Sequence, residues 1–179
     1  MKALRKYDIA FIGLKDGAHS FNFDIDKTFF ELFDFDEYED AAIKADIELV
    51  KKSTLLEFAI YISGFIHVFC DLTNEPYNQP IDGQLNLVVK FGEEYIDNGD
   101  DIIVIPRGEH KVNIAQQLYE LIVLSVPSKL VHPGISDGSL DSDIIQKLEE
   151  LAPQENKKTN NSDKTDPRWD SLKNLITDK

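Results

Sequence analysis

Three stretches of this chain alternate apolar and polar residues with a period of two, and this pattern constrains the fold more than any other feature. The first apolar row is Ile43, Ala45, Ile47 and Leu49, the second is Leu56, Phe58, Ile60 and Ile62, and the third is Leu85, Leu87, Val89 and Phe91. Successive side chains of a strand point to opposite faces of its sheet. Each stretch therefore predicts a strand with one buried and one wet face.

Turn signals suggest how the first strands are connected. Asp16-Gly17 separates the strand-like runs Lys6–Ile12 and His19–Ile25, which predicts a hairpin between them. Ser53-Thr54 forms the next corner. Gly64 interrupts the long strand that starts at Leu56, and a glycine inside a strand predicts a bulge.

The strongest hairpin signal is Asn98-Gly99, because this dipeptide suits the tight turns that join antiparallel strands. It lies between the strand-like runs Gln84–Tyr95 and Ile102–Ile105, which we expect to pair. The first two-thirds of the chain thus predict an antiparallel meander, curved or closed into a partial barrel.

Helical spacing appears in short pieces. Asp26 can cap one or two turns over Lys27–Phe33, and Asn113 can cap a helix that starts at Ile114 and ends before Pro127. A further helix opens at Asp141 or Ser142 and ends near Leu151. The predicted fold class is α+β, with the meander sheet followed by two or three helices and a short tethered C-terminal helix.

The end of the chain differs in composition from the rest. Residues 153–165 are polar and predict a flexible linker after a single domain over residues 1–152. Residues 166–179 predict a docking helix, capped by Asp166, in which Trp169 and Leu172 belong to one apolar stripe. Such a short helix needs a surface to pack on, which could be its own body or a partner.

The charge distribution limits the class of partner. The chain has a net charge of −14, which divides into −16 over residues 1–156 and +2 over residues 157–179. Nucleic-acid binding needs a basic face, so the acidic body speaks against gripping RNA by itself and favours a basic protein partner. One cysteine and the lack of a long apolar run or signal peptide favour a cytoplasmic protein without a membrane segment.

Evidence for catalysis is thin. The chain has no G-x-S-x-G, P-loop or H-E-x-x-H motif. Cys70 could pair with His110 or His132 as a thiolate enzyme acting on RNA or nucleotides, which is the alternative function. A buried structural cysteine is the favoured interpretation. We expect no enzyme activity, no metal and no other cofactor.

Three segments, in order, resemble one family. Phe69–Tyr77 is similar to a central cysteine motif, Ile114–His132 to a block with a helix and a later histidine, and Asp166–Leu175 to a terminal "D/N-P-then-helix". They resemble the YceD family, the large ribosomal RNA subunit accumulation proteins. The resemblance implies a ribosome biogenesis factor that supports accumulation of large-subunit (23S) ribosomal RNA. In the family motif a second cysteine follows at C-x-x-C spacing, where this chain has Thr73, and a hydroxyl is a poor zinc ligand.

The expected partner is a basic ribosomal protein or a pre-ribosomal large-subunit particle, and direct contact with RNA is left open. The candidate partner-binding residues fall in the tail, the cysteine motif, the connection before the main helix and the histidine block: Arg168, Trp169, Leu172, Lys173, Cys70, Glu75, Pro76, Tyr77, Arg107, His110 and His132. Tyr77 is a candidate anchor if it is exposed and a core residue if it is buried.

Overall fold

The computed structural model describes residues 3–97, 101–140 and 143–151. Its elements are η1 (Ala3–Tyr7), β1 (Asp8–Ala10), β2 (Gly17–Asp26), α1 (Lys27–Glu31), β3 (Asp40–Lys51), β4 (Leu55–Phe69), β5 (Pro76–Gly92), β6 (Ile96–Asp97), β7 (Ile102–Pro106), β8 (Lys111–Asn113), α2 (Ala115–Ser125), α3 (Pro133–Asp137) and α4 (Asp143–Leu151). The chain divides into a unit up to Ile145 and a second unit from Gln146 onward. The sheet and α1–α3 belong to the first unit.

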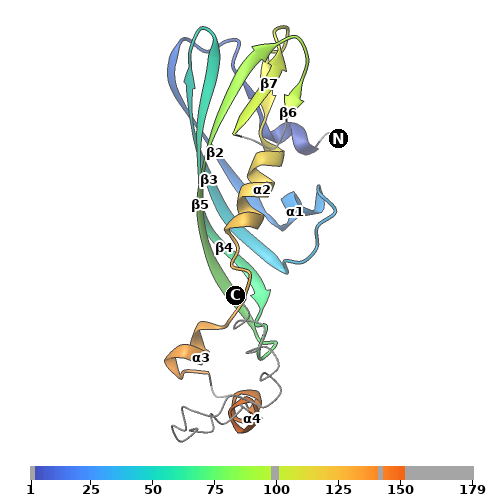
Figure 1. Cartoon of the computed structure of the whole chain (residues 1–179), viewed down its shortest axis with the longest axis vertical. Helices are drawn as coiled ribbons and strands as arrows, with labels where there is room; N and C mark the ends of the chain where they lie inside the picture. The colour runs from blue at the N-terminus through green and yellow to red at the C-terminus, as the bar shows by residue number, and fades with distance from the viewer. Residues whose placement is uncertain (1–2, 98–100, 141–142, 152–179) are drawn as a thin grey trace, which may run out of the picture. The chain divides into compact units, whose positions relative to one another are not determined.

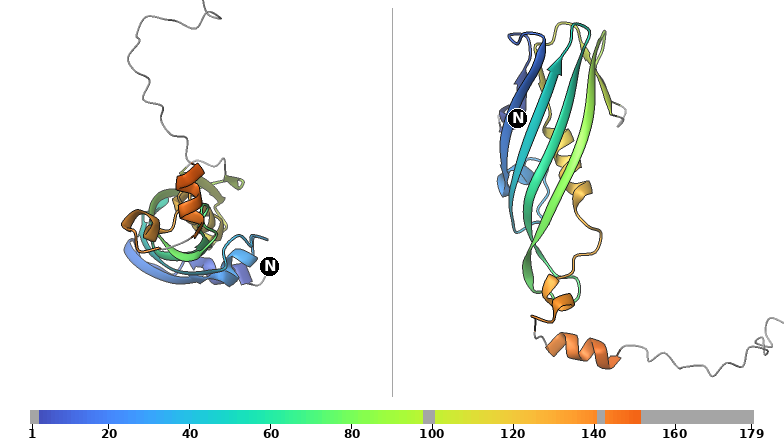
Figure 2. Two further views of the ribbon diagram at one scale, coloured as in Figure 1. Left: turned by 90° about the horizontal axis from the view of Figure 1, so that it is seen from below. Right: turned by 90° about the vertical axis from the view of Figure 1, so that its left-hand side faces the viewer.

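A six-stranded sheet, in the order β2-β3-β4-β5-β7-β6, forms the body of the first unit. Its long strands twist together and α2 lies along its concave side (Figure 1). Seen from below, the sheet curls partway around that helix and stays open (Figure 2, left). The α+β fold class and the curved, mostly antiparallel sheet are confirmed.

The concave side of the sheet holds the core, as the alternation predicts. The inward apolar side chains of β3 and β4 are all buried, including Ala45, Leu49, Leu56 and Ile60 at 0% exposure. From α2 and the residue before it, Ile114, Leu118 and Ile122 pack against them, also at 0%. A period of two on the sheet and a period near 3.6 on the helix therefore bury one face of each.

Two helix boundaries agree with the sequence. Asp26 accepts a hydrogen bond from the Thr28 backbone N–H at 3.0 Å and caps α1. Asn113 Oδ1 accepts one from the Ala115 N–H at 3.1 Å at the start of α2. That helix ends at Ser125, because Val126 is extended before Pro127. The short α3 then follows, with His132 as its N-cap.

The predicted hairpin around Asp16-Gly17 is wrong. β1 pairs with β8 instead of β2, with Ile9 opposite Val112, and the two form a separate small sheet. Asp8 holds this pair together, because it accepts hydrogen bonds from Lys111 Nζ at 2.5 Å and Asn113 Nδ2 at 2.7 Å. These contacts join residues more than a hundred positions apart, which no local turn signal reveals.

The pairing predicted after β5 is also wrong. β7 lies beside β5 in parallel, with Val88 opposite Ile102, and pairs in antiparallel with β6. The chain reverses after Gly92, so the antiparallel partner of β7 is the short β6 and not the long strand. The Asn98-Gly99 turn itself lies outside the described residues.

Gly64 does not form the predicted bulge. The register of β4 with β3 and with β5 runs unbroken through it, opposite Ile43 and Ile81. A Cβ on Gly64 would collide with the Ala42 carbonyl oxygen and lie 2.7 Å from the Ile43 Cα. The glycine is needed because β3 approaches closely there.

Candidate functional site

The loop between β4 and β5 carries the cysteine motif, and we call residues 70–77 together with 130–134 the Cys70 corner. The loop is closed by hydrogen bonds from the Cys70 N–H to the Glu75 oxygen at 2.9 Å and from the Asn74 N–H to the Cys70 oxygen at 2.8 Å. Asn74 has φ of 57°, a left-handed conformation that asparagine tolerates better than most residues. The motif is thus a tight hairpin loop at one end of the sheet.

The segment that follows α2 closes over this loop. The Asp71 N–H donates to the Leu130 oxygen at 2.7 Å, and the Leu130 N–H donates to Asp71 Oδ2 at 2.7 Å. The His132 backbone N–H donates to the Cys70 sulfur at 3.3 Å. Two blocks that stand 62 residues apart in the sequence therefore meet at Cys70.

Cys70 is only 2% exposed. Burial opposes its ionisation, but the hydroxyl of Thr73 and the backbone N–H groups of His132, Leu72 and Thr73 outweigh burial and lower the pKa of the thiol. The Thr73 hydroxyl is buried beside the sulfur without standard hydrogen-bond geometry to any described atom. Thr73 thus stands at the position of the second cysteine of the family motif. The described residues include no group of three or more His, Cys, Asp or Glu side chains that could hold a metal ion.

Tyr77 and His132 complete the corner. Their rings lie 5.3 Å apart, Tyr77 is 6% exposed, and its hydroxyl donates to Gln79 Oε1 at 3.0 Å. His132 Nδ1 accepts from the Gly134 N–H at 2.9 Å and caps α3. The burial of Tyr77 makes it a core residue, so of the two interpretations the exposed anchor is excluded.

The family model for large ribosomal RNA subunit accumulation protein YceD matches residues 58–176, about two-thirds of the chain. This chain belongs to the YceD family. The match spans both blocks that meet at the Cys70 corner and implies a role in accumulation of large-subunit ribosomal RNA. No curated protein and no solved structure matches the chain.

The other candidate residues of this YceD-family protein lie elsewhere. Arg107 and His110 are exposed in the turn after β7, where the Arg107 N–H donates to the Gly92 oxygen at 3.2 Å. β5 runs from Pro76 to Gly92, so at about 3.3 Å per residue this turn and the Cys70 corner stand about 50 Å apart. They cannot contribute to one small site.

The tail candidates Arg168, Trp169, Leu172 and Lys173 lie outside the described residues, as do the predicted linker and docking helix. Their part in partner binding stays a prediction. Glu75 and Pro76 lie at the Cys70 corner, with Glu75 half-buried and Pro76 exposed. No helix among the described residues is long and apolar enough to span a membrane.

The structure adds a surface that sequence reasoning missed. On the convex side of the sheet, Tyr61, Phe65 and Phe69 point outward from β4 and are 45%, 39% and 43% exposed. We call these three residues the aromatic row. The signal was present in the sequence, since aromatic residues recur every fourth position on the face of β4 opposite the core.

Proposed function

We propose that this YceD-family chain is a non-enzymatic ribosome biogenesis factor that supports accumulation of large-subunit (23S) ribosomal RNA. It would do so by binding a basic ribosomal protein or a pre-ribosomal large-subunit particle. The family match over residues 58–176 is the observation that carries this proposal.

Charge favours a protein partner over bare RNA. Residues 1–156 carry a net charge of −16, and phosphates approach such a body against repulsion. A lysine- and arginine-rich ribosomal protein is attracted by the same field. Binding to the body would keep that protein soluble until it is placed on the RNA, and the weakly basic tail is the segment best suited to lie near phosphates.

The Cys70 corner supports a structural role for its cysteine. A catalytic thiolate needs access to its substrate, whereas Cys70 is 2% exposed and its sulfur accepts the His132 backbone N–H. Locking the segment after α2 onto the β4–β5 loop fixes the end of the sheet. We infer that Cys70 shapes the surface around it and carries no chemistry.

The proposal is tested by deleting the gene in its native cells and measuring the ratio of large- to small-subunit ribosomal RNA. The ratio should fall and should return when the full chain is expressed from a plasmid. An unchanged ratio in the deletion strain would refute the proposed role. Rescue by Cys70→Ala at normal protein level is expected, and failure of a stably folded Cys70→Ala to rescue would point to the enzyme alternative.

The partner is tested by affinity purification of the tagged chain from its own lysate, with and without ribonuclease. Basic large-subunit proteins should remain bound after ribonuclease treatment. Their loss would mean that RNA bridges the contact and would contradict direct protein binding. Trp169→Ala tests the tail: we expect loss of bound protein while the melting curve of the body is unchanged.

A further inference from the structure

The convex face of the sheet presents exposed aromatic rings that have apolar cross-strand neighbours. In the cross-strand register Ala42 is opposite Phe65 and Phe65 is opposite Pro80, while Phe69 is opposite Pro76. These three cross-strand neighbours are apolar, whereas His67, which lies between Phe65 and Phe69 on the same face, is polar and is paired with Asp40 and Asn78. Figure 2 (right) looks onto this face of β2–β5, and no helix within residues 3–97 and 101–140 covers it. Exposed aromatic residues that gather on one face of a sheet are typical of an interaction surface.

A hollow lies beside the aromatic row. It has a volume of about 420 Å³ and is lined by Ala42, Gly64 and Phe65 on its apolar side and by Asp24 and Asp26 at its edge. Ala42 carries only a methyl group on this face, while Gly64, which is opposite Ile43 in the inward row, contributes only backbone to the hollow. It offers room for one long side chain whose end reaches the carboxylates.

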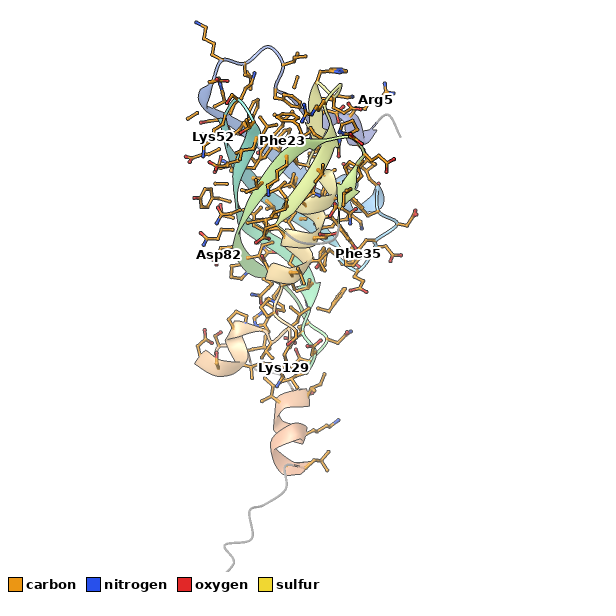
Figure 3. The ribbon with its side chains drawn as sticks, turned by 45° about the horizontal axis from the view of Figure 1, so that its top comes forward. Arg5, Phe23, Phe35, Lys52, Asp82 and Lys129 are labelled. Carbon is orange, nitrogen blue, oxygen red and sulfur yellow. The ribbon has the colours of Figure 1, made fainter. Side chains whose placement is uncertain are left out.

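Carboxylates surround the aromatic row. Asp24, Asp26, Asp40, Asp46 and Asp82 are all exposed on this face, against one lysine among them, Lys44. Hydrogen bonds from Thr28 lower the pKa of Asp26, so that this carboxylate stays ionised. Figure 3 shows the Asp82 side chain on the side of β5 away from α2. The face is thus aromatic in the middle and negative around it.

We propose that this convex face binds an arginine-rich segment of a partner protein. A guanidinium group can stack on an exposed aromatic ring while its N–H groups reach a nearby carboxylate. Phe65 and Phe69 would supply the rings. The charge would come from Asp82, opposite Ser63, and from Asp40, opposite His67, each one strand pairing away from the aromatic row. The same carboxylates repel RNA phosphates and a second copy of this chain.

This inference rests on the proposed function, because it assigns a surface to the basic partner, and it is tested separately. A fluorescent arginine–glycine repeat peptide is titrated with the full chain and followed by anisotropy at low and physiological salt. The double variant Phe65→Ser/Phe69→Ser should weaken binding about tenfold or more, since stacked aromatic contacts dominate such interfaces. Asp82→Asn should weaken binding less and reduce its salt dependence.

Leu124→Ser is the matched control, because Leu124 is 83% exposed on α2, away from the convex face. It should bind the peptide as the wild-type chain does. Equal binding by the Phe65→Ser/Phe69→Ser variant and by the control would overturn the inference. So would tighter binding of single-stranded RNA than of the peptide, or a wild-type dimer that this double variant dissociates.

The two proposals can fail independently. If the peptide does not bind while deletion of the gene still lowers the large-subunit RNA ratio, the convex face is not the contact and the proposed function stands. If the peptide binds as expected and the RNA ratio does not change in the deletion strain, the surface is real and its partner lies outside ribosome assembly.

Discussion

Replacing Gly64 by alanine tests why the long strand β4 contains a glycine at its centre. The new Cβ would collide with the Ala42 carbonyl oxygen and lie 2.7 Å from the Ile43 Cα. Both atoms belong to the backbone of β3, which is paired on its other side with β2 and cannot shift by itself. Overpacking a rigid site costs about 1–3 kcal/mol, and we expect the upper end, about 3 kcal/mol.

For a chain of this size, about 3 kcal/mol corresponds to a fall in Tm of about 6–12 °C. Unfolding in urea and by heat should be followed by far-UV circular dichroism, which reports directly on the strands. Gly108→Ala is the matched control: a Cβ there meets nothing within 4 Å, and its stability should stay within about 0.5 kcal/mol of wild type.

A second variant separates backbone from side-chain crowding. In Ala42→Gly/Gly64→Ala the Ala42 methyl group is gone but its carbonyl oxygen remains, so the double variant should be no more stable than Gly64→Ala. If Ala42→Gly restored the stability lost in Gly64→Ala, crowding between side chains would be the cause of the loss. If Gly64→Ala had the same Tm as Gly108→Ala, the close approach of β3 and β4 would be refuted.

Three further predictions concern the side chains of Asp8, Asp26 and Cys70. Burial opposes ionisation of Asp8, but its hydrogen bonds to Lys111 and a neighbouring asparagine outweigh burial and lower its pKa. The stabilisation from the ionised carboxylate is complete above about pH 4 and is lost as the pH falls through the folded-state pKa. The Tm difference between wild type and Asp8→Asn should therefore vanish in acid. Asp26→Ala removes the α1 cap and should cost about 1 kcal/mol in urea unfolding. A thiol reagent should label Cys70 much more slowly in the native chain than in urea, and Asp71→Ala should raise the native rate about tenfold by freeing Leu130; equal native and denatured rates would contradict the buried corner.

The strands of this fold could be predicted from the sequence because their signal is local. In Ile43–Leu49 and Leu56–Ile62 every second residue is apolar, and burial against α2 enforces the same period in the structure. Which strands pair with one another cannot be read from such a local pattern. β1 joins β8 through Asp8 and Lys111, and β7 lies parallel to β5, because contacts distant in the sequence outweigh the nearest turn.

The candidate site divides in the same way. The sequence singled out Cys70 and His132 separately, and only the fold shows that the sulfur accepts the His132 backbone N–H. The bulge predicted at Gly64 was wrong because sequence cannot distinguish an extra residue from a close approach of backbones. The aromatic row was missed because sequence reasoning followed the inward apolar row of β4 and gave no role to the aromatic residues of its other face.

The strand β4 links the two surfaces on which the proposals depend. Its inward residues, such as Ile60 and Ile66, are fully buried, while Phe65 and Phe69 face outward from the same strand. Since the side-chain period of a strand is two, selection can alter the outer face without disturbing the core. Phe65 and Phe69 contribute little to stability while they remain exposed, so their presence amid carboxylates is better explained by a bound partner than by folding. The buried Cys70 follows directly after this strand, and its sulfur accepts the His132 backbone N–H, so the segment after α2 is held at the end of β4.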